Sequence, residues 1–100
     1  MPAYLLALTI HLHLPDNGSL KGKRKELSSV KAQLQRRFGA AVAETGYHDL
    51  WQRSELTAAL VGREAGPLRD KAAAVERYVI SMFPDGARVE CQMVSKEDLV

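Results

Sequence analysis

The sequence is poor in cysteine, in aromatic residues and in long apolar runs. Its single cysteine, Cys91, has no intrachain partner, which excludes a disulfide scaffold and favours a reducing compartment, so we expect a cytoplasmic protein. No run approaches the roughly 20 apolar residues that span a bilayer, and no basic segment followed by an apolar stretch suggests a secretory signal. With 46% hydrophobic and 26% charged residues, the 100-residue chain is expected to form one globular domain over residues 1–100, with no membrane partner.

Basic residues are concentrated in one segment, although the net charge is only +2. Residues 17–38 carry seven lysines and arginines against a single acid, Glu26, so this segment has a net charge of +6 and the remainder −4. The seven are Lys21, Lys23, Arg24, Lys25, Lys31, Arg36 and Arg37. Such a concentration favours a phosphate backbone or another acidic partner. A solvated helix that carries lysines only for solubility explains the pattern equally well.

The N-terminal part predicts a strand followed by a helix. Apolar residues occupy the even positions of Ala3–Leu14, so these face a core, while the odd positions form a mixed, partly wet face. Pro15–Gly18 has turn chemistry and Ser19 is suited to cap a helix over Leu20–Phe38. Gly39 ends that helix. Its expected buried side consists of Leu27, Val30, Leu34 and Phe38.

The remaining chain predicts a hairpin, a second helix and a last strand. Ala40–Thr45 and Trp51–Val61 are expected to pair around a tip at Gly46–Asp49. A loop over Gly62–Gly66 leads to a helix whose first residue is Pro67 and which runs to Met82. A turn at Pro84–Gly86 precedes a strand over Arg88–Ser95. The residues expected to face inward are Leu68, Ala72, Val75, Val79, Met82, Val89, Cys91 and Met93.

The order β-α-β-β-α-β predicts an α+β, ferredoxin-like sandwich. Right-handed crossovers then give a four-stranded antiparallel sheet in the order 4-1-3-2, with both helices on one face. The other face is left open, and its small apolar residues Leu5, Ala7, Ala59 and Val61 suit a partner surface, most simply a second copy of the chain.

This topology brings three loops to one end of the domain: the turn into the first helix, the hairpin tip and the turn before the last strand. Lys21, Lys23 and Arg24 lie in the first turns of the helix, where basic residues oppose the helix dipole. A nearby acid or a bound anion should compensate for them. Lys23 projects toward the sheet side, so it either pairs with Asp49 or Asp85 or binds an anion.

Trp51 admits two interpretations. At the start of the third strand it covers the end of the sheet as a structural anchor, or it is an exposed platform for stacking. RNA recognition motifs share the topology, but they stack bases on sheet aromatics, and Trp51 is the only large aromatic expected near the open face. Readout of RNA by the sheet face is therefore not expected.

No constellation predicts catalysis or a cofactor. The pair His11 and His13 shares a strand face, but a metal site needs a further ligand and a supporting shell. Acylphosphatases of similar size carry an Asn on the third strand, which WQRSELTAALV lacks. No nucleophile motif is present. We expect a protein without enzymatic activity, metal or cofactor.

Two segments together, SLKGKR at 19–24 and AETGYHDLWQR at 43–53, resemble the YlxP-like family of small uncharacterised bacterial proteins. The resemblance extends over nearly the whole chain. It implies a ferredoxin-like fold and a protein with no established enzymatic activity. Genes of this family are often found among those for translation and ribosome-maturation factors, which implies a role related to RNA or the ribosome. The matching motif residues are Ser19, Leu20, Lys21, Lys23, Arg24, Asp49, Leu50, Trp51, Gln52 and Arg53.

The leading hypothesis is a module that binds structured RNA or a ribosomal component through the basic helix. Its candidate anion- and nucleic-acid-binding residues are Lys21, Lys23, Arg24, Lys25, Arg36, Arg37, His48, Trp51 and Arg53. The alternative is a homo-oligomeric domain, such as a homodimer, that senses a ligand or binds a protein. In that case the open sheet face is buried between subunits and the basic helix is merely solvated.

Overall fold

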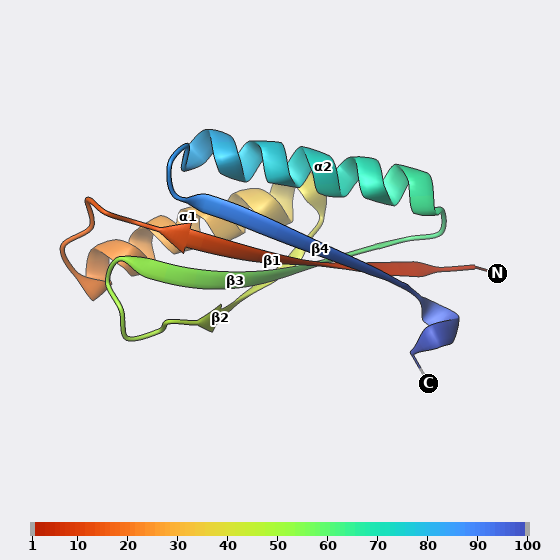
Figure 1. The fold of residues 1–100 in the computed structure, drawn as a ribbon, viewed down its shortest axis with the longest axis horizontal. Helices are drawn as coiled ribbons and strands as arrows, with labels where there is room; N and C mark the ends of the chain where they lie inside the picture. The colour runs from red at the N-terminus through yellow and green to blue at the C-terminus, as the bar shows by residue number, and fades with distance from the viewer. Residues whose placement is uncertain (1, 100) are drawn as a thin grey trace.

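The elements follow the expected order in a computed structural model that describes residues 2–99. They are β1 (Tyr4–His13), α1 (Leu20–Phe38), β2 (Ala41–Gly46), β3 (Arg53–Gly62), α2 (Ala65–Met82), β4 (Ala87–Ser95) and a short 3₁₀ helix, η1 (Lys96–Asp98). All strand pairs are antiparallel and the sheet order is β2-β3-β1-β4. Both helices cover the same face of the sheet (Figure 1). The prediction of a ferredoxin-like α+β sandwich is confirmed.

The core lies between the helices and one face of the two central strands. Leu8 of β1 pairs with Ala58 of β3, and both are fully buried, as are Ile10 and its partner Leu56. Because side chains alternate along a strand, the odd positions of both strands face the other way, as predicted. Leu27, Val30 and Leu34 of α1 and Leu68, Ala72, Val75 and Val79 of α2 close the core from the helix side.

Local sequence signals set the ends of α1. The hydroxyl of Ser19 accepts a hydrogen bond from the backbone N–H of Gly22 at 3.0 Å, which satisfies one free donor of the first turn. Gly39 adopts the left-handed conformation with φ 67°, and its N–H returns to the last turn of the helix. The predicted bounds of α1 are therefore confirmed.

Three expectations about the second half need correction. The helix α2 begins at Ala65, so Pro67 is its third residue; a proline is accommodated there because N–H groups in the first turn have no helical partner. Met82 is half exposed, and Phe83, one residue later, takes the buried place. Cys91 pairs with Leu8 and so lies on the helix side of the sheet, but it is exposed because β4 is an edge strand that α2 leaves partly uncovered.

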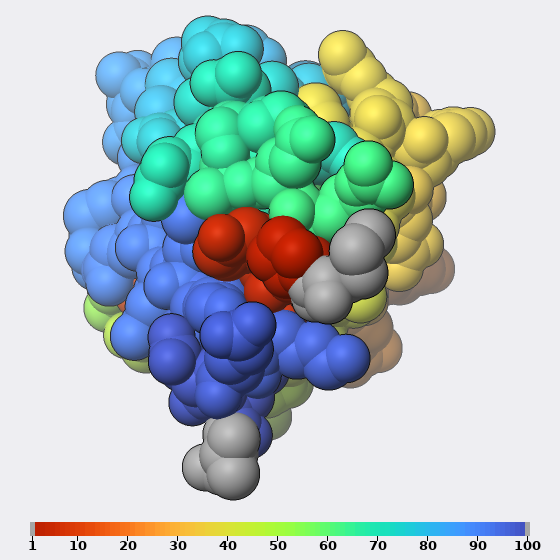
Figure 2. All heavy atoms as spheres, turned by 90° about the vertical axis from the view of Figure 1, so that its right-hand side faces the viewer, coloured from red at the N-terminus to blue at the C-terminus, as the bar shows by residue number. Residues whose placement is uncertain are grey.

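The two ends of the elongated molecule differ in what they expose. At the left of Figure 1, the β1–α1 turn, the β2–β3 loop and the α2–β4 turn lie near one another; we call this the hairpin end. Figure 2 shows the opposite end, where the start of β1 lies between the first turn of α2 and the residues after β4. There the Lys96 N–H donates to the carbonyl oxygen of Ala3 at 2.8 Å. No helix within residues 2–99 is long and apolar enough to cross a membrane.

Candidate functional site

Hydrogen bonds tie the three loops of the hairpin end together. The Leu14 N–H donates to the carbonyl oxygen of Gln52 at 2.8 Å, and the Gln52 side-chain amide donates to the carbonyl oxygen of Pro15 at 3.2 Å. The His13 N–H donates to the carbonyl oxygen of Gly86 at 2.7 Å. Segments from all parts of the chain therefore converge here, as the predicted topology requires.

Lys23 is the most buried ionisable residue of this end, with 1% of its surface exposed. Its Nζ lies 3.1 Å from Oε2 of Glu44 and donates to the carbonyl oxygen of Tyr47 at 2.5 Å. The expectation that Lys23 pairs with Asp49 or Asp85 is therefore wrong. Because the ammonium is buried and engaged, we exclude Lys23 from the surface that could contact a ligand.

Glu44 reaches Lys23 because it is on the covered side of the sheet. It pairs with buried Leu56, and a register shift follows between Glu44 and Gly46. Ser54, itself 1% exposed, donates to Glu44 Oε2 at 2.9 Å. Burial raises the pKa of the Glu44 carboxyl, but the hydrogen bonds from Lys23 and Ser54 and the charge of Lys23 together hold that pKa below its ordinary value. The pair is therefore charged and structural.

Tyr47 begins the loop between β2 and β3 in a strained backbone conformation. Its φ of 61° is in the left-handed region, which costs about 1–3 kcal/mol for a residue other than glycine. Its carbonyl oxygen accepts from Lys23 Nζ and from the Leu50 N–H at 3.1 Å. Lys23 thus holds the loop in a conformation that the loop sequence does not favour by itself.

Trp51 belongs to this loop and not to a strand, because β3 begins only at Arg53. Its side chain is 52% exposed, so the interpretation of Trp51 as an anchor that covers the sheet end is wrong. The side-chain amide of Asn17 donates both to the carbonyl oxygen of Trp51 and, at 2.8 Å, to that of Ser19. One side chain therefore connects the tryptophan with the cap of α1.

The other basic residues near the start of α1 remain open to solvent. Lys21, Arg24 and Lys25 are exposed, and none of them forms an ion pair with any residue in the range 2–99. The first turn of α1 contains no acid. Basic side chains near the start of a helix are unfavourable with its dipole unless an acid lies nearby. Glu44 is that acid for Lys23, whereas Lys21 and Arg24 have no acidic partner in residues 2–99. We call Lys21, Arg24, Lys25, Tyr47 and Trp51 the hairpin–helix surface.

Two predicted site residues lie far from this surface. Arg36 and Arg37 are in the last turn of α1, and its 19 residues span about 28 Å. This end of α1 points toward the opposite end of the molecule (Figures 1 and 2). The guanidinium of Arg37 lies 4.5 Å from the ring centre of Tyr78 on α2. Arg37 therefore contributes to helix–helix packing.

Arg53 and His48 flank the hairpin–helix surface. The Arg53 guanidinium lies 4.6 Å from the ring centre of Tyr47, a cation–π contact that leaves the tyrosine 41% exposed. Nε2 of His48 lies 3.2 Å from the carbonyl oxygen of Glu44, and the residue is exposed. Both therefore remain near the loop without being buried.

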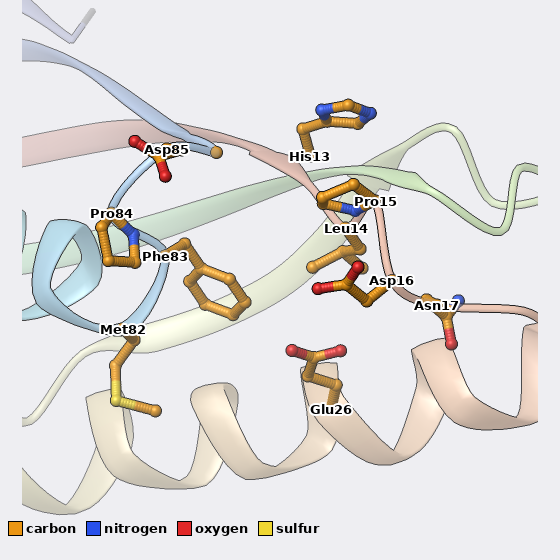
Figure 3. Close-up of a pocket in the computed structure, with 11 residues that line it drawn as sticks. His13, Leu14, Pro15, Asp16, Asn17, Glu26, Met82, Phe83, Pro84 and Asp85 are labelled. Carbon is orange, nitrogen blue, oxygen red and sulfur yellow. The ribbon is translucent and has the colours of Figure 1, made fainter.

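A pocket of about 380 Å³ lies on the other side of the hairpin end, between α1, the β1–α1 turn and the α2–β4 turn. Its wall carries the carboxylates of Asp16, Glu26 and Asp85, and Phe83 forms part of its apolar lining (Figure 3). This side would repel a phosphate backbone. The hairpin end is therefore divided into a basic, aromatic side and an acidic side.

On the β1–β4 part of the open sheet face, three side chains interact with one another. Nε2 of His11 lies 3.1 Å from Oε1 of Glu90, and Arg88 also pairs with that carboxylate. Arg88 lowers the pKa of Glu90 by its hydrogen bond and charge. Within residues 2–99, no group of three or more histidines, cysteines and acids is arranged to hold a metal ion. His11 and His13 therefore do not belong to such a group.

Sequence reasoning missed the contacts of three residues that organise this site. The local pattern places Asn17 only in a turn, Glu44 only in a strand and Tyr47 only at a hairpin tip, yet each takes part in a contact between distant segments. The presence of an acid in the otherwise small, apolar segment AVAETG is the one local signal for Glu44. Buried charges are paired, so this acid is a candidate partner for a lysine on the core-facing side of a helix.

Comparisons with known proteins support the fold and the family. A family model described as "Protein of unknown function (DUF503)" matches residues 5–93. The chain is 41% identical over 70 residues to the uncharacterised protein YlxP of Bacillus subtilis (strain 168), an alignment covering 70% of this chain and 75% of that protein. This agrees with the resemblance seen in the sequence.

Two solved structures share the architecture at low sequence identity. The de novo designed protein Foldit4 has a TM-score of 0.59 and 9% identity, with 92% of this chain and 96% of that chain covered. A mutant of SnoaB, a cofactor-independent oxygenase from Streptomyces nogalater, has a TM-score of 0.52 and 11% identity, with 90% of each chain covered. At such identities the likeness concerns the fold alone. From the family match and the YlxP relative, this chain belongs to the DUF503 family of proteins of unknown function.

Proposed function

We propose that this protein is a non-enzymatic module that binds RNA, or a ribosomal component that presents RNA, through the hairpin–helix surface. The observation that carries the proposal is the combination of two exposed aromatic rings with three basic side chains that have no acidic partner in residues 2–99. Proteins that bind single-stranded nucleic acids combine these two elements, since cations contact phosphates and rings contact bases.

Hydrogen bonds support the idea that the two elements act as one surface. Asn17 links Trp51 to the cap residue Ser19, which lies two positions before Lys21. Lys23 links Tyr47 to the residue next to Arg24. The loop backbone that carries the two rings is therefore joined to the start of α1 before any ligand arrives, which reduces the ordering cost of binding.

The distribution of charge supports one direction of approach. Asp16, Glu26 and Asp85 line the pocket on the other side of the hairpin end and would repel phosphates there. An RNA backbone is therefore expected to pass along the first turns of α1 and the β2–β3 loop. Arg36 and Arg37 are expected to assist by long-range attraction only, because they lie at the other end of α1.

The proposal is tested by filter binding of a labelled ribosomal RNA fragment at several salt concentrations. Three phosphate contacts predict that the logarithm of the association constant falls with the logarithm of salt concentration with a slope of about −2. The double variant Lys21→Glu and Lys25→Glu is expected to lose most of the affinity and to flatten this slope.

A matched control separates the local surface from net charge. The double variant Arg69→Glu and Lys71→Glu changes two exposed residues of α2 and alters the net charge by the same amount. It is expected to retain most of the affinity. Equal losses in the two double variants, or no salt-dependent binding by the unaltered protein at low ionic strength, would refute the proposal.

A second candidate function, self-association, is favoured by the apolar half of the open sheet face. Leu5 pairs with Val61 of β3 and with Val94 of β4, and the next row contains Ala7 and Ala59. Val61 is 70% exposed and lies beside Leu5, so it forms part of an apolar patch and not an isolated exposed side chain. Sedimentation equilibrium distinguishes the functions: a stable dimer that Val61→Lys dissociates, and that does not bind polyanions, would favour self-association.

A further inference from the structure

We infer that the hairpin–helix surface takes an unpaired nucleotide, whose base stacks on Trp51, rather than an RNA duplex. This inference rests on the proposed function and adds the class of RNA. In a duplex the base faces are covered by neighbouring base pairs, and the deep, narrow major groove of A-form RNA is closed to side chains. An aromatic ring can therefore contact a base face only where the base is unpaired.

The surroundings of Trp51 fit a base better than they fit a purely apolar ligand. A concavity of about 290 Å³ is lined by residues 49–53. Leu50 and Trp51, 47% and 52% exposed, provide its apolar part. Asp49, Gln52 and Arg53 add polar groups around it; of these, the Gln52 amide nitrogen already donates to the carbonyl oxygen of Pro15, and the Arg53 guanidinium lies over the Tyr47 ring. A nucleobase has an apolar face and a polar edge, so its face matches the ring and its edge matches the polar groups.

The loop backbone that carries Trp51 is fixed from both sides. The Asn17 amide holds the carbonyl oxygen of Trp51, and the Leu14 N–H holds that of Gln52. Lys23 holds the start of the loop at Tyr47. The tryptophan is thus a large exposed ring on a preorganised backbone, in contrast to an exposed aromatic on a free loop, and stacking on it requires little additional ordering.

The exposed cations at the start of α1 are expected to contact the phosphates of the stacked nucleotide. Lys21 and Arg24 lie close in sequence to the residues that Asn17 and Lys23 join to the loop, and both are exposed. A flexible single strand can bring a phosphate to these cations while one of its bases lies on the ring. The acidic pocket on the other side excludes the second strand of a duplex from a continuous contact.

The experiment uses the intrinsic fluorescence of Trp51, which is the only tryptophan of the chain. The probes are an eight-nucleotide oligoadenylate, an abasic ribose-phosphate oligomer of the same length and charge, and an RNA duplex of mixed sequence. The oligoadenylate is expected to quench Trp51 and to bind about five- to 150-fold more tightly than the abasic oligomer, the range that stacking of one base provides. The duplex is expected to bind by charge without quenching.

Variants separate stacking from charge when binding is followed by the anisotropy of labelled oligomers. Trp51→Leu is expected to remove the preference for oligoadenylate over the abasic oligomer and to keep the salt dependence. Trp51→Phe, which retains an aromatic ring, is expected to keep part of the preference. The quenching in the unaltered protein needs no variant, so the inference stays testable if Trp51→Leu folds poorly.

The outcomes distinguish this inference from the proposed function. If the abasic and base-containing oligomers bind equally, with a salt dependence that Lys21→Glu and Lys25→Glu abolish, the stacking inference is overturned and RNA binding stands. Equal quenching by the duplex also overturns it. If none of the probes binds at low ionic strength, the proposed function and the inference fail together.

Discussion

Replacing Lys23 with methionine tests the account of the hairpin end most directly. Methionine has nearly the length of the lysine stem, so Lys23→Met removes the ammonium and leaves the packing of α1 against the sheet largely intact. The variant loses the ion pair with Glu44 at 3.1 Å and the hydrogen bond to the carbonyl oxygen of Tyr47. It leaves the Glu44 carboxylate with Ser54 as its remaining side-chain donor.

The expected loss of stability follows from the burial of the pair. Removing one partner of a buried ion pair costs about 3–5 kcal/mol, because the other charge is left uncompensated. The Glu44 side chain is 20% exposed and keeps the hydrogen bond from Ser54, so water and a hydroxyl offset part of this cost. We expect a loss near the lower limit, about 3 kcal/mol. A domain of this size has about 5–15 kcal/mol of stability, so the variant should still fold.

Urea denaturation measures this effect, with Lys25→Met as the control. Lys25 is on the same helix two residues later, but it is exposed and unpaired within residues 2–99, so its replacement should change the free energy of unfolding by no more than about 0.5 kcal/mol. The double variant Lys23→Met and Glu44→Gln should recover part of the loss, since no charge is then left buried. If Lys23→Met is as stable as Lys25→Met, the structural role of the pair is refuted.

The same variant should change the dependence of stability on pH. The Lys23 and Ser54 hydrogen bonds and the Lys23 charge lower the pKa of Glu44 in the folded protein, against the opposing effect of burial. The stabilisation from this shift is present above the pKa of the unfolded chain and is lost as the pH falls through the lower folded value. In the unaltered protein, stability should therefore decrease in acid below about the ordinary value of 4.5. Lys23→Met should make this decrease smaller.

Three further predictions concern glycine and cysteine positions. Gly86→Ala should lower stability in thermal denaturation by about 1–3 kcal/mol, because the new Cβ would lie 2.4 Å from the carbonyl oxygen of His13; an unchanged melting temperature would contradict this close approach. Gly39→Ala should lower the free energy of unfolding by about 1–2 kcal/mol, because a side chain disfavours the φ of 67° at this position. Gly39→Asn should lower it less, since asparagine adopts this conformation more readily; equal losses would show that the backbone conformation is not the cause. Cys91 should react with iodoacetamide more slowly than free cysteine at about pH 8, although the residue is exposed, because partial burial of the thiol and the charge of Glu76 raise its pKa. Glu76→Gln should speed the reaction, and an unchanged rate would exclude the charge effect.

The position of the hairpin–helix surface could be predicted only in part from sequence. Right-handed crossovers brought the β1–α1 turn and the β2–β3 loop to one end without any knowledge of side-chain contacts. The concentration of basic residues in residues 17–38 predicts Lys21, Arg24 and Lys25 as candidate site residues. The spacing also predicts that Lys23 projects toward the sheet, but it leaves open whether the ammonium pairs with an acid or binds an anion, and it does not identify Glu44 as the partner.

Local patterns by themselves determined the elements of this protein. The alternation in β1, the buried stripe of α1 and the cap residues Ser19 and Gly39 each depend on neighbours within a few positions, so a period of two or 3.6 residues and one special residue are enough to predict them. Once these elements are known, their order along the chain and the right-handed crossovers favour one order of strands in the sheet.

The tertiary structure alone decided which distant residues meet. The partner of Lys23 is Glu44 rather than Asp49 because the strand register pairs Glu44 with buried Leu56 and so places this carboxylate on the covered side of the sheet. Trp51 is exposed because β3 begins two residues later than the apolar pattern indicates, and the preceding loop projects beyond the sheet. The strand register and the position of the loop depend on the packing of the whole domain. They therefore cannot be predicted from a short stretch of sequence.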